Sequence, residues 1–315
     1  MSGDSCHGVF AAGRGCTKHP THVVSDVSRE HLARAVADAT GADVVGMTVV
    51  HGGDTAAAFR IELASGDVLF AKTHPSPPVG FFSTEAWGLE WLRSSDAVHV
   101  PRVVAVSDGE GGEPAFLALE WIDTRGGRSS DEAVFGRQLA LLHGSGAPCF
   151  GREDRRTTGS LALPNEPSAT WSDFVANCRF LPLARIARDR SALPPDTIDR
   201  LERLASTLDR FDDGSPPVRL HGDLWAGNRI VDRDGESWLI DPAAHGGHPE
   251  FDLAMMRLFG GFGADAFERY ADVRPLLDGW ADRVELHQIA PLVVHAIKFG
   301  GGYVAASARA VDRYV

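Results

Sequence analysis

The first third of the chain has a pattern of apolar and polar positions that predicts a small sheet with two helices. Apolar residues recur at three- and four-residue spacing from Ser28, which we take as an N-cap, to Gly41, a typical helix stop. The same spacing predicts a second helix, at 82–92. Strands are predicted at 43–50, 57–63, 68–73, 102–107 and 115–122. Turns rich in Gly, Ser and Asp separate the first three of these strands, which is typical of an antiparallel meander.

After Asp123 the pattern becomes mainly helical. Helices are predicted at 131–143, 170–180 and 196–209, and again from Phe251 onward, with short strands at 218–220, 229–231 and 238–240. We therefore expect an α+β fold of two lobes. The expected parts are an N-terminal extension at 1–27, a first lobe with a small antiparallel sheet and one main helix at 28–122, and a larger, mostly helical second lobe at 123–315.

Composition narrows the classes of function. The chain has 315 residues, with 31 Lys and Arg against 43 Asp and Glu, so its net charge is −12. This balance argues against a nucleic-acid partner and against binding to an anionic membrane, and the apolar runs are far shorter than the ~20 residues of a membrane span. Four cysteines are too sparse for a disulfide scaffold, and no signal-peptide pattern is visible, so we expect a cytoplasmic protein.

The cysteines near the start of the chain have a second interpretation. Cys6 and Cys16 lie close to His7 and His19, which together offer zinc ligands. Their spacing fits no closed zinc pattern, because such sites place paired ligands two to four residues apart. The segment is rich in Gly and small residues, so we expect a flexible extension instead.

The most informative segment reads HGDLWAGN at 221–228, and Asp241 follows Asn228 by thirteen residues. Phosphoryl transfer needs a carboxylate that orients and deprotonates a hydroxyl, and oxygen ligands for the Mg²⁺ that neutralises the phosphates. Asp223 and Asn228 lie five apart on one loop, and Asp241 ends the next hairpin. Taken alone, a Gly-Asp pair is an ordinary turn. The order of the three residues is that of a kinase-type catalytic hairpin.

The first lobe tests this hypothesis separately. A kinase places a Gly-containing hairpin over the phosphates, a Lys on the third strand and a Glu on the following helix. Gly52 and Gly53 lie in the first predicted hairpin, Lys72 on the third strand and Glu85 on the next helix. A double glycine is also an ordinary turn, and a lysine often ends a strand. The chain has only two other lysines, however, at positions 18 and 298.

These segments resemble the fructosamine kinase (ketosamine kinase) family, a branch of the aminoglycoside-phosphotransferase-like kinases with a bilobal, protein-kinase-like fold. The resemblance runs from about residue 29 to the end. It is carried by FSTEAWGLEWL at 82–92, HGDLWAGN at 221–228, IDPAAHGGHPEFDLAM at 240–255 and LFGGF at 258–262. The Trp after Leu in the second block and the LFGGF block are far more specific than the general His-x-Asp pattern.

The resemblance implies roles for individual residues. Asp223 matches the catalytic aspartate that accepts the proton of a sugar hydroxyl. Asn228 and Asp241 match the Mg²⁺ ligands. Lys72 matches the lysine on the ATP phosphates, and Glu85 matches its partner on the helix.

Other positions follow with less support from the pattern. Glu120 and Ile122 fall at the hinge between the lobes, where backbone groups of such kinases bind adenine. Gly52 and Gly53 match the phosphate hairpin, although the family's usual Ile-Asn is absent after it. Trp225 either packs on the sugar or amine of the substrate or is a core aromatic residue.

The implied activity is transfer of phosphate from ATP, with Mg²⁺, to the 3-hydroxyl of a ketosamine such as a fructosamine or ribulosamine, in the repair of glycated amines. The partner is then a small ketosamine or glycated amine. A kinase for aminoglycosides or choline is the alternative within the same fold. Two other classes stay open: a non-catalytic nucleotide-binding module, and a metal-dependent hydrolase. The hydrolase would use as ligands His221, Asp223, His245 and His248. The oligomeric state and the preferred sugar are left open.

Overall fold

The computed structural model describes residues 26–50, 56–125 and 129–315. Its first part is a five-stranded antiparallel sheet with the strand order β1-β2-β3-β5-β4. The strands are β1 (Val44–Val50), β2 (Ala57–Leu63), β3 (Val68–Thr73), β4 (Val103–Asp108) and β5 (Ala115–Glu120). Between β4 and β5 lies the short 3₁₀ helix η1 (Glu110–Gly112). The predicted meander of β1, β2 and β3 is therefore confirmed, and β5 lies between β3 and β4.

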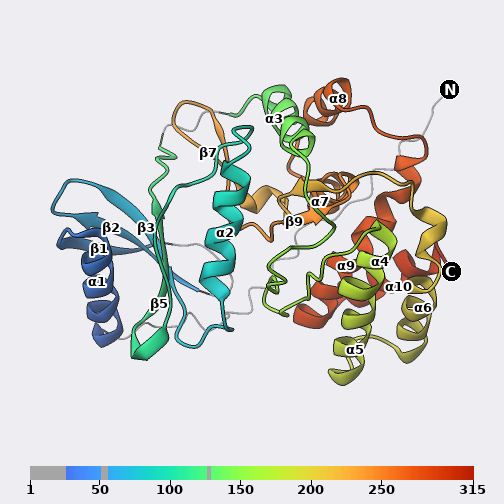
Figure 1. Ribbon diagram of the computed structural model, residues 1–315, viewed down its shortest axis with the longest axis horizontal. Coiled ribbons are helices and arrows are strands. Elements are labelled where there is room, and N and C mark those ends of the chain that lie inside the picture. The colour runs from blue at the N-terminus through green and yellow to red at the C-terminus, as the bar shows by residue number, and fades with distance from the viewer. Residues whose placement is uncertain (1–25, 51–55, 126–128) are drawn as a thin grey trace, which may run out of the picture.

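One helix covers each face of this sheet (Figure 1). Helix α1 (Asp26–Thr40) packs on one face and α2 (Phe81–Arg93) on the other. Strand β5 shows how the sequence produces this layering. Phe116 and Ala118 point into the core under α1, while Leu117 and Leu119 point toward α2. The alternation follows from the two-residue period of a strand, and here both faces are apolar because both are covered.

Helix α2 also belongs to the second part of the chain. Phe82 and Leu89 of α2 share one buried cluster with Leu117 of the sheet and with Leu139 and Leu253, which lie far beyond residue 123. The side of α2 that faces away from the sheet is tightly packed as well, because a Cβ on Gly88 would lie only 3.2 Å from that of Ala244. The hydrophobic core is therefore continuous between the sheet and the second half.

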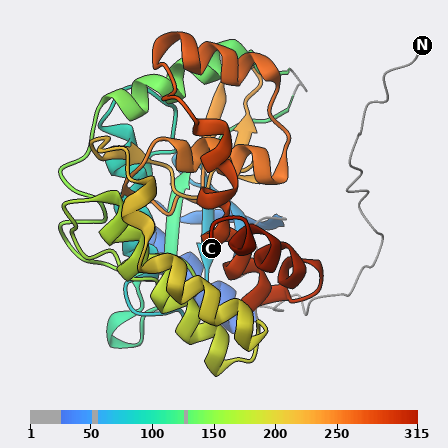
Figure 2. The same ribbon diagram turned by 90° about the vertical axis from the view of Figure 1, so that its right-hand side faces the viewer.

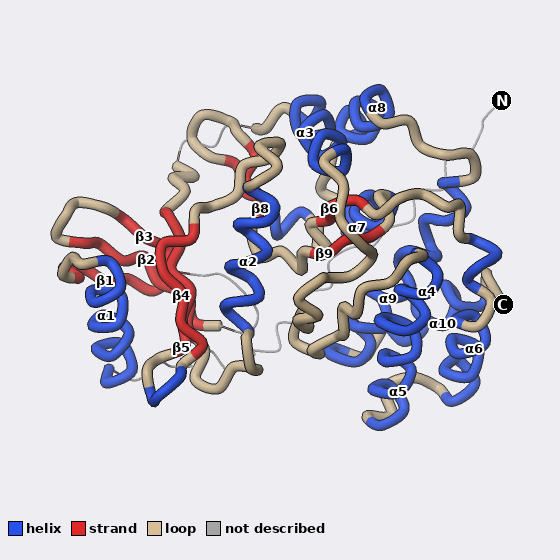
Figure 3. Tube along the Cα trace, in the orientation of Figure 1, coloured by secondary structure: helices blue, strands red, loops and turns tan. Residues whose placement is uncertain are grey.

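The second half is mostly helical (Figure 3). Its helices are α3 (Glu132–Gly144), α4 (Trp171–Val175), η2 (Ala176–Phe180), α5 (Leu181–Asp189), α6 (Pro195–Ala205), η3 (Leu208–Phe211), η4 (Ala226–Asn228), α7 (Glu250–Phe259), α8 (Ala264–Val273), α9 (Trp280–Phe299) and α10 (Gly302–Asp312). Figure 2 shows α5, α6 and the C-terminal helices toward the viewer, with the C-terminus among them. The expected α+β class is confirmed.

Two short antiparallel pairs of strands support the polar loop that the sequence singles out. They are β6 (Val218–Leu220) with β9 (His245–Gly247), and β7 (Arg229–Val231) with β8 (Ser237–Leu239). Strand β9 was not predicted, because its Gly-rich sequence lacks the branched residues typical of strands. The structure requires glycine there, since a Cβ on Gly246 would lie 1.9 Å from the carbonyl oxygen of Cys149.

Three predicted helix boundaries are wrong, and one of them is the end of α6, which lies at Ala205 and not at residue 209. Helix α1 begins at Asp26, so Ser28 lies inside the helix and is not its N-cap. Both residues are common at helix starts, and the apolar spacing does not distinguish them. The predicted helix at 170–180 in fact runs on through a π-helical turn, η2, into α5, which ends at Asp189. A π turn shifts the helical period locally, so a pattern search based on 3.6 residues per turn loses the continuation.

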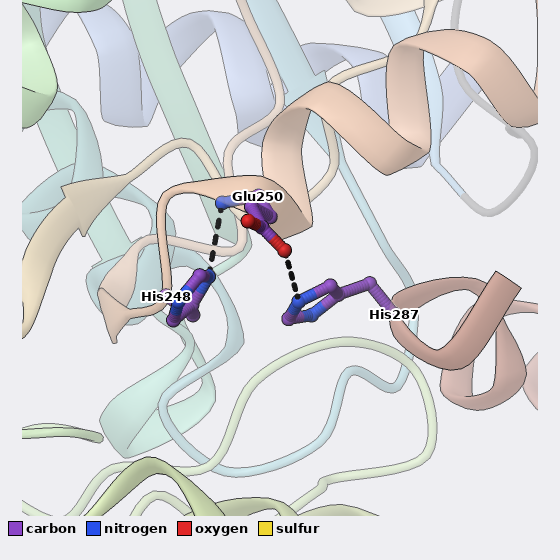
Figure 4. A group of neighbouring side chains, drawn as sticks. All are labelled: His248, Glu250 and His287. Carbon is purple, nitrogen blue, oxygen red and sulfur yellow. Dashed lines mark hydrogen bonds and ion pairs between the residues drawn. The ribbon is translucent and has the colours of Figure 1, made fainter. Parts of the chain in front are cut away.

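A buried polar cluster joins the start of α7 to α9 (Figure 4). Glu250 accepts hydrogen bonds from Arg283, with 2.9 Å from Nε to Oε2, and His287 Nε2 lies 3.4 Å from the same carboxylate. The backbone N–H of Glu250 donates to Nδ1 of His248, whose Nε2 lies 3.1 Å from Asp213. Because these contacts occupy both nitrogens of His248, the cluster fits a structural network and not a metal site.

No helix in the described part of the chain is long and apolar enough to cross a membrane. The same ranges contain two cysteines, Cys149 and Cys178, and both are free thiols. Cys6 and Cys16 lie outside the described residues, as do Gly52 and Gly53.

The cluster around His287 predicts acid sensitivity. Burial lowers the pKa of His287 to about 4, although Glu250 opposes the shift. Unfolded histidine has a pKa of about 6.5, so between pH 6.5 and 4 the unfolded chain takes up a proton that the folded chain does not. Stability is therefore lost as the pH falls through this window. When the pH is lowered from 7 to 5, the free energy of unfolding of the wild type should fall by about 2 kcal/mol more than that of His287→Gln, as measured by urea unfolding.

His99→Gln is the control, because His99 has a half-exposed side chain. It should keep the pH dependence of the wild type. Equal pH dependence in the wild type and in His287→Gln would contradict the assignment of acid sensitivity to His287.

Candidate active site

The predicted residues converge on one cavity of about 600 Å³. It lies between the sheet and the second half, and its walls come from β3, α2, the segment after β5 and the loop 223–243. Of the predicted site residues, those that line it are Lys72, Glu85, Glu120, Ile122, Asp223, Trp225, Asn228 and Asp241. The volume is in the usual range for a small-molecule site.

Lys72 lies at the centre of the charged part of the cavity. Its Nζ is 2.6 Å from Oε1 of Glu85 and 2.7 Å from Oδ1 of Asp241. Burial opposes a charge on Lys72, but the two carboxylates outweigh it and raise the pKa of this lysine. Burial, with the nearby charge of Asp241, raises the pKa of Glu85 to about 7. One ammonium thus connects β3, α2 and the turn after β8.

Asp241 has an unusual backbone conformation. It follows β8, and its φ of 52° places it in the left-handed region, which costs a residue other than glycine about 1 kcal/mol or more. Its carboxylate is ionised: burial would raise its pKa, but Lys72 lowers it below the ordinary value. The ion pair with Lys72 holds the side chain toward the cavity, and such strain is typical of functional positions.

Asp223 and Asn228 face each other across the loop 223–228. The side-chain nitrogen of Asn228 donates to the backbone oxygen of Asp223 at 2.9 Å and to its Oδ2 at 3.1 Å. The amide oxygen of Asn228 therefore points away from Asp223. Burial, together with the charge of Asp241, raises the pKa of Asp223 to about 6, although the hydrogen bond from Asn228 opposes this. Asp223 is therefore a carboxylate that is ionised at neutral pH and more basic than usual.

Asp252, which is fully buried in α7, fixes the start of this loop. Its carboxylate accepts the backbone N–H groups of His221 at 2.8 Å and Gly222 at 3.0 Å, and it contacts Nε2 of His143 at 3.3 Å. Gly222 has a φ of +81°, and a Cβ there would lie 2.2 Å from the carbonyl oxygen of Ala243. Only glycine fits this position.

His221 is held as a neutral ring. Its Nδ1 accepts the N–H of Asp223, so Nε2 carries the proton and donates to the carbonyl of Ile240 at 3.0 Å. Burial lowers its pKa, which agrees with this neutral form. The ring connects the strand pair of Asp223 to that of Asp241.

Part of the predicted hinge forms hydrogen bonds within the protein. The N–H of Glu120 donates to the carbonyl of Arg102, and Oε1 of Glu120 accepts the N–H of Arg102. The N–H and the side chain of Glu120 are thus used in the structure, while Glu120 and Ile122 both line the cavity.

Trp225 lines the cavity and is not a core residue. Its side chain is 40% exposed, and its ring lies 6.0 Å from that of Phe259. The ring covers Gly227, where a Cβ would come within 2.2 Å of it. Trp225 therefore presents an aromatic face beside Asp223.

Sequence reasoning missed several parts of the cavity wall, among them residues 78–81. Residues 157–160 line it, and Arg179 holds the preceding loop by donating to Pro164 and to Asn165 at 2.7 and 2.8 Å. Lys298, at the end of α9, lines it as well. The scarcity of lysine was the only signal for Lys298, because its segment lies 70 residues after Asn228.

The ligands proposed for a hydrolase are not assembled. Asp223 lines the cavity. The three histidines His221, His245 and His248 are not among its described lining residues. His245 is buried beside Phe174 and Phe251, and burial lowers its pKa to about 3.

Comparison with known proteins decides the family. The model of the family described as "Fructosamine kinase" matches residues 28–315. The chain belongs to the fructosamine kinase family. It is 33% identical over 235 residues to the "Probable ketoamine kinase slr1563" of Synechocystis, covering 74% of this chain and 78% of the relative. It is 31% identical over 251 residues to the "Protein-ribulosamine 3-kinase, chloroplastic" of Arabidopsis thaliana, covering 78% and 76%.

A solved structure supports the same assignment. The fold of this fructosamine kinase family member matches a crystal structure assigned as a fructosamine-3-kinase from Thermobifida fusca, with a TM-score of 0.81 and 38% identity. The match covers 90% of this chain and 98% of the other. The expected bilobal, protein-kinase-like fold is confirmed. As a member of this family, the protein is an ATP-using phosphotransferase that acts on a hydroxyl group.

The contacts of Asp252 generate a prediction. In Asp252→Asn an amide N–H₂ replaces one oxygen that now accepts backbone hydrogen bonds, so a buried donor loses its acceptor. We expect a loss of about 3 kcal/mol of unfolding free energy in urea, and lower activity because the loop with Asp223 shifts.

Asp282→Asn is the matched control, because the side chain of Asp282 is 83% exposed and forms an ion pair with the surface residue Arg313. It should cost less than about 1 kcal/mol. A loss in Asp252→Asn no larger than in the control would show that Asp252 does not stabilise the loop.

Proposed function

We propose that the protein transfers the γ-phosphoryl group of ATP to the 3-hydroxyl of a ketosamine, such as a fructosamine or ribulosamine, in the repair of glycated amines. The observation that carries this proposal is the convergence of Lys72, Glu85, Asp223, Asn228 and Asp241 on one cavity. Family membership and the printed name of the Arabidopsis relative support the choice of acceptor.

In this proposal Lys72 binds the phosphates of ATP, and Glu85 holds it in place. The base is bound at the hinge. The carbonyl of Glu120 accepts a hydrogen bond from the amino group of adenine, and the N–H of Ile122 donates to a ring nitrogen. The N–H of Glu120 is excluded from this role because it already donates to Arg102. Gly52 and Gly53 remain predicted phosphate contacts outside the described residues.

The residues present fit a Mg²⁺ ion. Hard divalent cations prefer oxygen ligands. The ionised Asp241 supplies a carboxylate, and Asn228 supplies an amide oxygen because its nitrogen donates to Asp223. When bound, the ion would neutralise charge on the phosphates.

Asp223 acts as the general base. A base is most effective when its pKa lies near the working pH, and burial brings the pKa of Asp223 to about 6. The carboxylate orients the sugar hydroxyl and accepts its proton as the oxygen attacks phosphorus. Trp225, with its exposed ring beside Asp223, packs against the sugar or the amine.

The enzyme is then a cytoplasmic one with a small-molecule partner and no nucleic-acid or membrane partner. The acidic balance of the chain and the free thiols of Cys149 and Cys178 support this part of the proposal.

The activity is tested by a panel of acceptors. ATP consumption is measured with fructosyl-lysine, ribulosyl-lysine, free sugars, choline and aminoglycosides, and NMR locates the phosphate. We expect turnover with a ketosamine and phosphate on its 3-hydroxyl. Phosphorylation of an aminoglycoside or choline, with none of any ketosamine, would overturn the proposal.

The role of Asp223 gives a second test. Asp223→Asn keeps the shape of the side chain but removes the base, so kcat should fall by about 10²–10⁴. Binding of Mg²⁺-ATP should be largely intact, as measured by calorimetry, because Asn228 and Asp241 remain.

Asp234→Asn, at a turn where the side chain is 75% exposed, is the control and should keep its kcat. Loss of ATP binding in Asp223→Asn would mean that Asp223 serves the nucleotide and is not the base.

A further inference from the structure

A strip of aromatic side chains continues from Trp225 along the second half. Each ring contacts the next: Trp225 and Phe259 at 6.0 Å between centroids, Phe259 and His295 at 5.0 Å, and His295 and Phe299 at 5.5 Å. Tyr303 closes the series at 5.0 Å from His295. We call these five residues the aromatic strip. Phe299 is 44% exposed, so the strip, like Trp225, presents apolar surface to solvent.

Lys298 places a positive charge on this strip. Its Nζ lies 5.2 Å from the centre of the Phe299 ring, and the residue lines the same cavity as Asp223 and Trp225. Its charge also acts on the carboxylate of Asp223 and favours its ionised form. Lys298 is therefore on the acceptor side of the cavity, close to the base.

Lys298 is exposed and is held by no ion pair among the described residues. Among the described residues, no carboxylate oxygen lies within 4.0 Å of Nζ of Lys298. The only other cationic side chain among the described lining residues is Lys72, which is held by Glu85 and Asp241. An unpaired ammonium in a cavity that is otherwise rich in carboxylates is a site for an anionic group of a ligand.

The expected position of the sugar indicates which anionic group of the ligand reaches Lys298. If Asp223 takes the proton of a sugar hydroxyl, the sugar lies at Asp223 and Trp225, and the substituent on its amine extends over the aromatic strip. We propose that Lys298 binds the carboxylate of this substituent, so that the substrate class is a ketosamine of a free amino acid. The inference rests on the proposed function. A glycated lysine inside a protein carries an amide at this place and lacks the charge.

The aromatic strip and the ammonium of Lys298 together suit such an acceptor. A lysine side chain offers four methylene groups, which can pack on the rings of the strip, followed by the α-carbon with its carboxylate. A lysine ammonium and a carboxylate form a charge-assisted hydrogen bond, about twice as strong as a neutral one.

The test compares two acceptors that differ only in this charge. They are Nα-acetyl-Nε-fructosyl-lysine and its carboxamide, and the Michaelis constants for both and for ATP are measured in the wild type, Lys298→Gln and Lys298→Arg. In the wild type we expect a KM about tenfold lower for the acid than for the amide. In Lys298→Gln the ratio should fall to about one, and Lys298→Arg should restore most of it.

The other outcomes separate the two proposals. If both acceptors are phosphorylated with equal KM in the wild type, or if the ratio persists in Lys298→Gln, the role of Lys298 is wrong and the ketosamine kinase activity stands. A rise in KM for ATP in Lys298→Gln, with the ratio unchanged, would place Lys298 at the nucleotide and overturn the inference. If an aminoglycoside or choline is phosphorylated while neither acceptor, nor the corresponding pair of ribulosyl-lysine derivatives, is phosphorylated, both proposals fail.

Discussion

A single ammonium group shared by two carboxylates is the interaction on which the site depends. Lys72 comes from the middle of the sheet, Glu85 from the helix behind it and Asp241 from a turn 169 residues further along the chain. Two buried carboxylates so close together would repel each other without the lysine between them. The ion pairs therefore fix the distance between the sheet and the loop that carries Asp223 and Asn228. The hydrogen bonds of His221 and Asp252 then orient that loop.

The site separates two aspartates by environment. Burial acts to raise the pKa of both Asp223 and Asp241. At Asp241 the charge of Lys72 reverses this effect, whereas at Asp223 the hydrogen bond from Asn228 and the charge of Lys298 oppose it without reversing it. One carboxylate is thus kept ionised and the other is made more basic, although both belong to the same cavity. A chain with a net charge of −12 can bind a polyanion in this way, because charge is arranged locally and the overall balance does not decide it.

The sequence predicted the loop at 221–228 and the charged residues of the cavity because the chemistry proposed for them needs particular residue types in a particular order. Asp223, Asn228 and Asp241 lie on a hairpin short enough for spacing alone to place them together, and the structure confirms that they share a cavity with Lys72 and Glu85. Lys298 could not be found in this way, since the packing of α9 against α7 brings it to the cavity and no local pattern records that packing. Strand β9 and the π turn η2 escaped for a related reason, because tertiary contacts override weak local propensities there.

The continuous core under α2 has a consequence for how the chain folds. Leu89 belongs to one buried cluster with Leu117 of the sheet and Leu253 of the second half, and the guanidinium of Arg152 lies 3.7 Å from the ring centre of Trp87. Cutting the chain at Asp123 would expose apolar surface on both fragments. The two lobes are therefore regions of one cooperative folding unit, and the sheet with α2 would not persist as an independent nucleotide-binding module. A cavity walled by one such unit forms only after residues on both sides of Asp123 have met.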